Sequence, residues 1–322
     1  MKSSRVIGCM LTHLPHIALG SLPLLLRLDI LIIFLPEAQK QRMLDLLKTV
    51  PKNAKPDILL VTHRIELKNG VPQMGLLRYE QQDLLQRHLQ KTDVGILLDH
   101  DIKLGAARFI SSKVLRQYNK KEAARKEYWN KCGVQNIKPN WGKRKAALTP
   151  EQLAEFERRG LGPLYSRPLS PEQFVDSARA LSQESLRLGF DFFSFGYANA
   201  AHNSRATKGG YHAVATWSGL VFLFKHSPNY YDPAMTIGSD ADVQFHIISE
   251  RKRLGVLCDP CTVVQMELKK EKYRDGGPQH IARLQNRDEI MKRYPNLCRP
   301  VQGNDIRCGL EHLKYTGFYG KE

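Results

Sequence analysis

The sequence has no uninterrupted hydrophobic run long enough to span a bilayer. Its most apolar stretch, from Leu14 to Pro36, is interrupted by Arg27 and Asp29, whereas a spanning helix needs about 20 consecutive apolar residues. This stretch also lacks the apolar core and small-residue cleavage site of a secretory signal peptide. We therefore expect a protein with no membrane-spanning segment and no signal peptide.

Cysteine is scarce. Six cysteines are scattered over 322 residues, which is no disulfide framework and favours a reducing, cytoplasmic compartment. Cys258 and Cys261 have C-x-x-C spacing, but no second pair or pair of histidines stands nearby, so the evidence for zinc is weak. We expect both to be structural thiols.

Acidic residues are too few to balance the basic ones. The chain has 32 acidic and 49 basic residues, which gives a net charge of +17. A strongly positive surface attracts polyanions, of which nucleic acid is the commonest. We expect contact with nucleic acid, while a generally basic surface without a specific partner is the alternative. Nothing in the sequence indicates a protein partner.

Internal repeats and low-complexity tracts are also absent, and residues 5–105 instead alternate strand and helix patterns. The expected strands are Arg5 to Leu11, Ile30 to Leu35, Ile58 to Thr62 and a run from Val94, and the expected helices are Leu19 to Arg27, Glu37 to Val50 and Leu76 to Leu89. Such alternation predicts an α/β fold, with a mostly parallel sheet flanked by helices. In such sheets, ligands bind beyond the carboxyl ends of the strands.

The fourth expected strand, from Val94, ends in Asp99 and Asp101. Side chains alternate along a strand, so these two carboxylates are expected on the same side. There they can share Mg²⁺ or Mn²⁺, which in turn binds a diphosphate. The alternative is two solvated acids at the start of a loop, because D-x-D alone is a weak motif.

Residues 106–148 form a basic segment, with 12 Lys and Arg residues against Glu122 and Glu127. Four aromatic residues are interleaved with the basic ones: Tyr118, Tyr128, Trp129 and Trp141. The cations could neutralise phosphates while the aromatic rings stack on bases. Equally, the segment could be a solvated insertion whose aromatic residues dock it to the core.

Two helix starts have the same chemistry. Thr149-Pro150-Glu151-Gln152 and Ser170-Pro171-Glu172-Gln173 each offer a capping hydroxyl, a proline at the first helical position and a glutamine at the third. These signals are structural and predict no chemistry.

Three polar segments of the C-terminal half are candidate site residues. The loop with His202, Asn203 and Arg205 could contact sugar hydroxyls or phosphate, or be a polar turn. In Ser239-Asp240-Ala241-Asp242 an acid could act as a general base, or the acids could lie in the first turn of a helix. The glycines of the turn at Gly276-Gly277 would let the backbone approach a ligand closely.

Taken in order, these motifs resemble the TET/JBP-associated glycosyltransferases. These are GT-A-type enzymes, often phage-encoded, similar to the glucosyltransferase that makes base J. The resemblance covers about residues 5–300 apart from the basic segment. The matching stretches are Gly70-Val71-Pro72-Gln73, Arg78, Leu98-Asp99-His100-Asp101, Ser170-Pro171-Glu172-Gln173, Gly196 to Arg205, Ser239-Asp240-Ala241-Asp242, Gly255 and Gly276-Gly277.

The chain departs from the family pattern at three places. His100 replaces the middle acid of the first motif, and Ser239 replaces the usual glutamate of the second. The segment with Thr12-His13 has no clear donor-binding loop. These departures leave the donor identity open and also leave open some loss of activity.

The resemblance implies a single GT-A-like domain over residues 1–322. It has a nucleotide-sugar-binding half at 5–105, a basic insertion at 106–148, and an acceptor half with a C-terminal extension at 149–322. It implies a hexosyltransferase that moves a sugar from a nucleotide sugar, with UDP-glucose favoured, to a hydroxymethylated pyrimidine base in DNA. A phage-encoded enzyme would work in the host cytoplasm.

The resemblance also implies roles for individual residues. Asp99 and Asp101 would bind Mn²⁺ or Mg²⁺, and Asp240 would be the catalytic base, with Asp242 as the second choice. The residues expected to bind the nucleotide sugar or line the acceptor pocket are Gln73, Arg78, His202, Asn203, Arg205, Gly276 and Gly277. The acceptor base would be flipped out of a duplex or met in a single strand.

Other functions fit the same residues. A glycosyltransferase acting on a small molecule or RNA would have weak, salt-insensitive affinity for DNA. A metal-dependent nuclease also uses clustered acids and a basic surface, and it would nick DNA with metal alone. A DNA-binding protein with a decayed transferase fold would keep its function when Asp99 is replaced by alanine.

Overall fold

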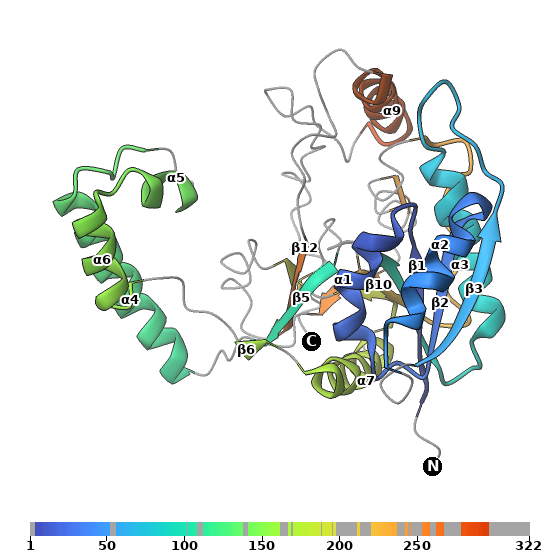
Figure 1. The fold of residues 1–322 in the computed structure, drawn as a ribbon, viewed down its shortest axis with the longest axis horizontal. Coiled ribbons are helices and arrows are strands. Elements are labelled where there is room, and N and C mark those ends of the chain that lie inside the picture. The colour runs from blue at the N-terminus through green and yellow to red at the C-terminus, as the bar shows by residue number, and fades with distance from the viewer. Residues whose placement is uncertain are drawn as a thin grey trace. The chain divides into compact units, whose positions relative to one another are not determined.

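The structure is a computed structural model of the chain. It describes residues 4–51, 56–100, 102–107, 112–137, 141–161, 167–168, 170–187, 189–194, 196–197, 211–212, 220–236, 242–243, 246, 253–257, 262–266 and 278–295. The chain forms two compact units (Figure 1), Met1–Ala106 with Pro168–Glu322, and Ala107–Arg167. No helix in the described ranges is long and apolar enough to cross a membrane.

The first unit is built on a mixed sheet. Among the described residues this sheet has eight strands: β1 (Val6–Leu11), β2 (Ile30–Pro36), β3 (Asp57–His63), β4 (Val94–Asp99), β7 (Phe190–Ser194), β9 (Tyr211–His212), β10 (Leu220–Leu223) and β11 (Arg253–Leu257). Their order is β3-β2-β1-β4-β10-β7-β11-β9. Of these described strands only β9 and β10 run against the rest. The predicted α/β class with a mostly parallel sheet is therefore confirmed.

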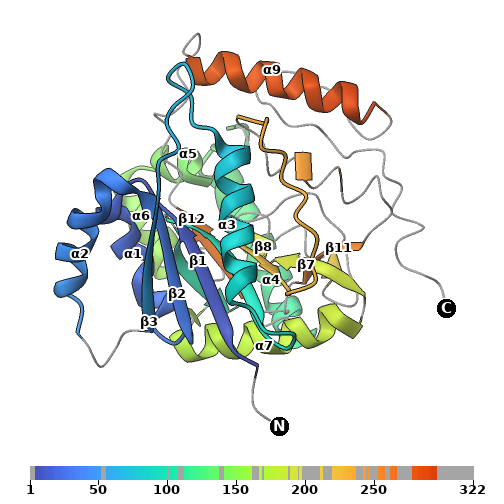
Figure 2. The same cartoon turned by 90° about the vertical axis from the view of Figure 1, so that its right-hand side faces the viewer.

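Helices flank the sheet. Helix α3 (Met74–His88) packs against β1 and β4, and α1 (Pro15–Leu25) packs against α7 (Pro171–Arg187), as Figures 1 and 2 show. Helix α1 begins four residues before the expected start at Leu19, because Pro15 takes the first helical position, where the missing N–H of proline costs nothing. The helix expected from Glu37 begins as a 3-10 turn and continues as α2 (Lys40–Lys48).

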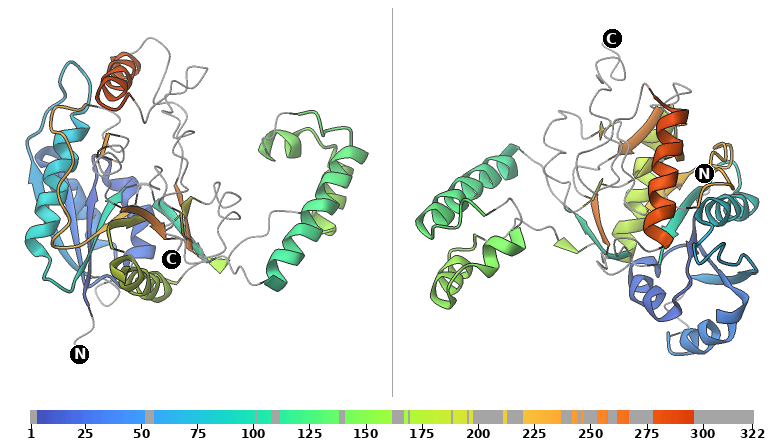
Figure 3. Two further views of the ribbon diagram at one scale, coloured as in Figure 1. Left: turned by 180° about the vertical axis from the view of Figure 1, so that it is seen from behind. Right: turned by 90° about the horizontal axis from the view of Figure 1, so that it is seen from above.

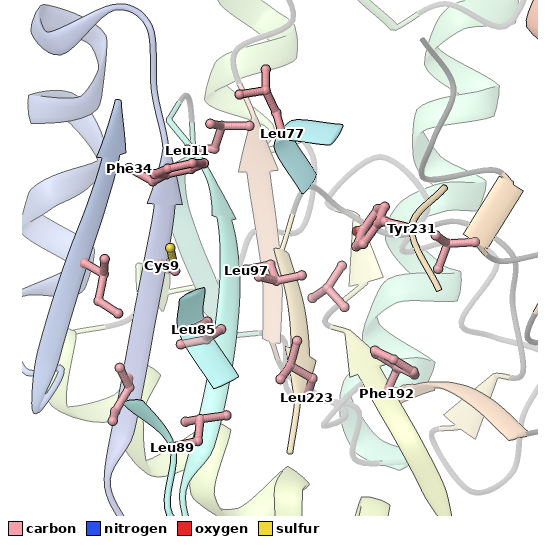
Figure 4. Packing of buried hydrophobic residues seen from close by; sticks show 14 residues of the cluster. Cys9, Leu11, Phe34, Leu77, Leu85, Leu89, Leu97, Phe192, Leu223 and Tyr231 are labelled. Atoms are coloured by element: carbon pink, nitrogen blue, oxygen red, sulfur yellow. The ribbon is translucent and has the colours of Figure 1, made fainter. Parts of the chain in front are cut away.

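Strand periodicity places the main core between the sheet and α3. Alternate residues of β1 (Ile7, Cys9 and Leu11) join Leu85 of α3 and Leu89, which follows its last turn, in one buried cluster, which Figure 4 shows. Leu97 of β4 belongs to the same cluster. Burial of so many apolar side chains is the main favourable term in folding and holds α3 firmly on this face.

A second, smaller sheet follows the end of β4. Its described strands lie in the order β6-β5-β12-β8, where β5 is Ile102–Ala107, β6 is Arg167–Pro168, β8 is Gly196–Tyr197 and β12 is Thr262–Met266. The sequence patterns do not predict this sheet, because its strands are short. Helix α9 (Pro278–Arg293) is the last described element of this unit.

The second unit is helical and has a core of its own (Figure 3). It contains α4 (Ser112–Lys131), α5 (Trp141–Ala146) and α6 (Pro150–Arg158) and extends to Arg167, beyond the insertion expected at 106–148. Tyr128, Trp129 and Phe156 are buried in its core with Val134, Leu148 and Leu161. Tyr128 and Trp129 are therefore packing residues, but the core that they fill is that of the helical unit itself, and they were expected either to stack on bases or to dock the segment to the main core.

Both predicted capping patterns form. Thr149 and Gln152 exchange the two hydrogen bonds of a capping box at the start of α6. Ser170 and Gln173 do the same at the start of α7. Side chains that satisfy the free N–H groups of a first turn fix where each helix begins.

Candidate active site

The sheet has a topological switch point between β1 and β4. From β1 the chain crosses to β2 and β3 on one side, and it then returns through α3 to β4 on the other side of β1. Ligands of open α/β sheets bind outside the carboxyl ends of the strands at such a point. Here those ends carry Thr12 and His13 after β1, and Asp99 and His100 at the end of β4.

Asp99 faces α3. It lies on the same side of β4 as Gly95 and Leu97, because side chains alternate along a strand, and Gly95 and Leu97 both lie against α3 residues of the core. Arg78 of α3 donates a hydrogen bond from Nη2 to Asp99 Oδ1. The side chain of Arg78 is 6% exposed and that of Asp99 is 23% exposed, so the carboxylate is the more accessible of the two partners.

Gln81 holds Arg78 in place. Its Oε1 accepts a hydrogen bond of 2.7 Å from Arg78 Nη1, and its Nε2 donates to the carbonyl oxygens of Cys9 at 2.6 Å and Leu98 at 3.3 Å. Gln81 is fully buried and connects β1, β4 and the guanidinium. A charged group held by buried hydrogen bonds has a fixed direction, because any other position would leave polar atoms unpaired.

Two histidines meet at the ends of β1 and β4. The rings of His13 and His100 are in edge-to-face contact, with centroids 4.9 Å apart. Ser21 of α1 donates from Oγ to the carbonyl oxygen of His100 at 2.8 Å. The turn after β1 is fixed by Thr12, whose N–H donates to Phe34 O at 2.9 Å. These contacts set the position of the backbone around Asp99.

The first backbone N–H groups of α3 are hydrogen-bonded to other parts of the chain. The N–H groups of Met74 and Gly75 donate to Thr236 O at 2.8 Å and Met235 O at 2.7 Å. Gln73, an expected donor-binding residue, donates from Nε2 to Glu66 O at 3.0 Å and so holds the preceding loop. The first amides of α3 therefore dock the 232–236 segment.

Asp242 is the buried member of a second cluster of charged residues. Its side chain is 2% exposed, and Oδ1 lies 3.5 Å from Arg293 Nη1 of α9. Arg293 also pairs with Asp232 at 2.6 Å and Glu289 at 3.1 Å. Burial raises the pKa of Asp242 above its ordinary value, although the nearby Arg293 guanidinium opposes the shift. A carboxylate with a raised pKa suits proton transfer, but this one is buried against Arg293 of α9.

The other expected site residues lie outside the described residues. They are Asp101, His202, Asn203, Arg205, Asp240, Gly276 and Gly277, together with the thiols Cys258 and Cys261. Of the residues expected at the site, the structure brings Asp99 and Arg78 into direct contact.

The chemistry at the end of β4 fits a hard divalent cation. Within the described ranges no three His, Cys, Asp or Glu side chains form a metal-binding group. Mg²⁺, however, is commonly held by one or two carboxylates together with substrate phosphates and water. Asp99 supplies a partly open carboxylate of this kind.

Sequence reasoning missed Gln81, Ser21 and the His13–His100 contact. A signal for Gln81 was available, because Arg78, Gln81, Gln82 and Leu85 follow the i, i+3, i+4 and i+7 spacing of one helix face, and all four are buried. Polar residues on a core-facing stripe need buried partners, which marks them as candidates. The histidine contact had no such signal, since its partners are 87 residues apart.

No protein-family model and no curated protein matches the sequence. Among solved structures, mouse xyloside xylosyltransferase 1 in its apo form is similar over 79% of this chain and 84% of its own, with 12% identity and a TM-score of 0.32. The 4-diphosphocytidyl-2C-methyl-D-erythritol synthase of Anaerococcus prevotii DSM 20548 is similar over 38% of this chain, with 10% identity and a TM-score of 0.23. This chain covers 52% of that synthase. Likeness at this level assigns the chain to no family.

Proposed function

We propose that this protein is a GT-A-like glycosyltransferase that moves a sugar from a nucleotide sugar to a hydroxymethylated pyrimidine base in DNA. The observation that carries the proposal is the Arg78–Asp99 pair at the switch point of the sheet. A carboxylate for a divalent cation and a guanidinium for phosphate stand side by side, where α/β folds bind nucleotides. The motif resemblance to the TET/JBP-associated glycosyltransferases supports the same function.

The chain's own residues would bind the donor as follows. Asp99 would be a ligand of Mn²⁺ or Mg²⁺, and Arg78 would donate to a phosphate oxygen of the diphosphate. When bound, the metal offsets the charge that develops on the leaving diphosphate. Asp240, or Asp242 after opening of its cluster, would take the proton from the acceptor hydroxyl. UDP-glucose is the favoured donor in this proposal.

The helical unit supports DNA as the partner. Residues 107–167 contain 15 basic and five acidic residues and so carry 10 of the chain's 17 net positive charges. Arg125, Arg144 and Arg159 serve the fold, because their guanidinium groups lie over the rings of Trp129 and Tyr128. Exposed lysines such as Lys120, Lys126 and Lys131 point to solvent and suit phosphate contacts.

Nucleoside mass spectrometry tests the proposal. The full-length protein is incubated with DNA containing hydroxymethylcytosine or hydroxymethyluracil, Mn²⁺ and a panel of nucleotide sugars, and the DNA is then digested. We expect a hexose-sized mass gain that is lost in Asp99→Ala. The matched control is Asp83→Ala, which removes an exposed carboxylate from α3 that pairs with Arg87, and it should keep the activity.

Other results would contradict the proposal. Nicking of DNA with metal alone, without a sugar donor, would indicate a nuclease. DNA binding without transfer from any donor would indicate a decayed transferase fold. Transfer to RNA or a small molecule would keep the transferase chemistry and overturn the acceptor.

A further inference from the structure

The strand β3 (Asp57–His63) has the composition of a central strand but the burial of an edge strand. Its sequence is Asp-Ile-Leu-Leu-Val-Thr-His, with four consecutive apolar residues at its centre. Continuous apolar runs are typical of parallel strands that are buried on both faces. All six residues of β1 and five of the seven in β2 are buried, whereas His63 is the one buried residue of β3. The apolar centre of β3 is therefore left partly uncovered.

The outer side of β3 is unpaired among the described strands, because β3 ends the order of the main sheet (Figure 1). Its pairing with β2 is regular over seven residues, from Ile30 opposite Asp57 to Pro36 opposite His63, so no bulge interrupts it. An unpaired edge presents backbone N–H and C=O groups to which another strand can add, and natural proteins protect such edges with lysine, proline or a bulge. The seven residues of β3 have none of these protections.

The charges at the two ends of β3 are self-complementary. Asp57 opens the strand and Arg64 follows it directly, and both are exposed. A two-fold axis perpendicular to the sheet brings two copies of an edge strand together in antiparallel orientation. With the axis at Leu60, all seven residues pair, and Asp57 lies opposite His63 of the second copy and close to its Arg64. An acid then meets a cation at both ends of the pair.

We propose that β3 is an interface with a second copy of this chain, in which the two edge strands pair antiparallel around Leu60 and join the two main sheets into one. The strand supplies both members of each charged contact, and its apolar centre meets itself, so the surface fits a second copy. Leu59, which is 38% exposed, would be covered by Val61 of the second copy. This inference does not depend on the proposed sugar transfer.

Sedimentation velocity of the full-length protein over a range of concentrations tests the inference. We expect the wild type to form a reversible dimer. Asp57→Lys brings two cations together at each end of the pair, and Arg64→Glu brings two acids together, so each variant alone should dimerise about 10- to 100-fold more weakly. An equimolar mixture of the two variants, with one of them labelled by a fluorophore, should form a heterodimer of wild-type affinity, because both ends again join an acid to a cation.

Leu59→Lys tests the apolar centre of the interface. A charge in the middle of an edge strand opposes the addition of another strand, so this variant should be monomeric. The matched control is Leu186→Lys, because Leu186 is 51% exposed and lies on α7, which packs against β7 and β11. This control should dimerise like the wild type. Circular dichroism checks that both variants are folded.

Three results would overturn the inference. A wild type that stays monomeric at every concentration would show that the second copy is not the occupant of this edge. A dimer that persists in Leu59→Lys and in both charge variants would use another surface. A mixture of Asp57→Lys and Arg64→Glu that dimerises no better than either variant alone would exclude the antiparallel pairing.

Discussion

At the scale of single residues, two clusters of charged side chains bear on the candidate site. Arg78 pairs with Asp99 and Gln81 near the end of β4, and Asp242 pairs with Arg293 near α9. Buried charges are costly unless they are paired and hydrogen-bonded. The first cluster opens toward solvent through Asp99, while in the second Asp242 is buried beneath the partly exposed Arg293 and Asp232.

The burial of Asp242 predicts a pH-dependent stability. Because burial raises the pKa of Asp242 in the folded state, the folded protein holds this proton more tightly than the unfolded chain. The resulting stability is present below the unfolded pKa of about 3.9 and is lost as pH rises through the folded pKa. Asp242→Asn cannot ionise and has no such loss.

Thermal unfolding of the wild type and Asp242→Asn, at pH values from 4 to 7.5, checks this prediction. The Tm of the variant relative to the wild type should rise with pH. The charged and titratable groups around Asp242 are Arg293, Asp232, His246 and Tyr294, so Asp45→Asn, on the exposed surface of α2, is the matched control. A Tm difference that stays flat or falls with pH would contradict the prediction.

At the scale of elements, α3 organises the candidate site. It carries Arg78 and Gln81, packs on β1 and β4, and docks the 232–236 segment on its first turn. Gly75 permits this docking: a Cβ atom at this position would lie 2.0 Å from Asp232 O and 2.4 Å from Met235 O.

Two glycine substitutions in helices should therefore have opposite effects. Gly75→Ala should lower the free energy of unfolding by about 1–3 kcal/mol, because backbone must move to admit the methyl group. Gly20→Ala in α1, where a Cβ meets nothing within 4 Å, should raise it by about 0.5–1 kcal/mol through helix propensity. Urea unfolding measures both, and a neutral Gly75→Ala would show that the segment docks loosely.

At the scale of the whole molecule, charge is distributed unevenly between the two units. The helical unit has its own core and carries 10 of the 17 net positive charges in 61 of the 322 residues. Because Tyr128 and Trp129 lie in that core, they are not exposed for base stacking. The exposed lysines of this unit would bind nucleic acid through phosphate contacts, which depend on salt.

The salt dependence of DNA affinity tests this assignment. Replacing Lys120, Lys126 and Lys131 together with glutamine should weaken binding and reduce the slope of log affinity against log salt, by up to about 0.9 for each lost phosphate contact on a duplex. The control triple variant Lys40→Gln, Lys48→Gln and Lys91→Gln removes the same charge from exposed positions of the first unit. Equal losses in both variants would support a generally basic surface without a specific face.

The sequence predicted well those features that depend on local pattern. The strands β1 to β4, helix α3 and both capping boxes follow from apolar periodicity and from Ser or Thr three residues before Gln. The end of β4 was also identified as a candidate site, from Asp99 and Asp101. These features need only neighbouring residues, so a single sequence carries them.

Only the tertiary structure decided how those pieces meet. The insertion of β10 beside β4, the second sheet and the separate helical core join residues far apart in the chain, and long-range pairing leaves no local signal. Arg78 was predicted to bind phosphate and Asp99 to bind metal, but their direct contact follows from α3 packing on the face of β4 that carries Asp99. The sequence by itself determined which chemical groups are available. The packing of helix on sheet decided which of them form an ion pair.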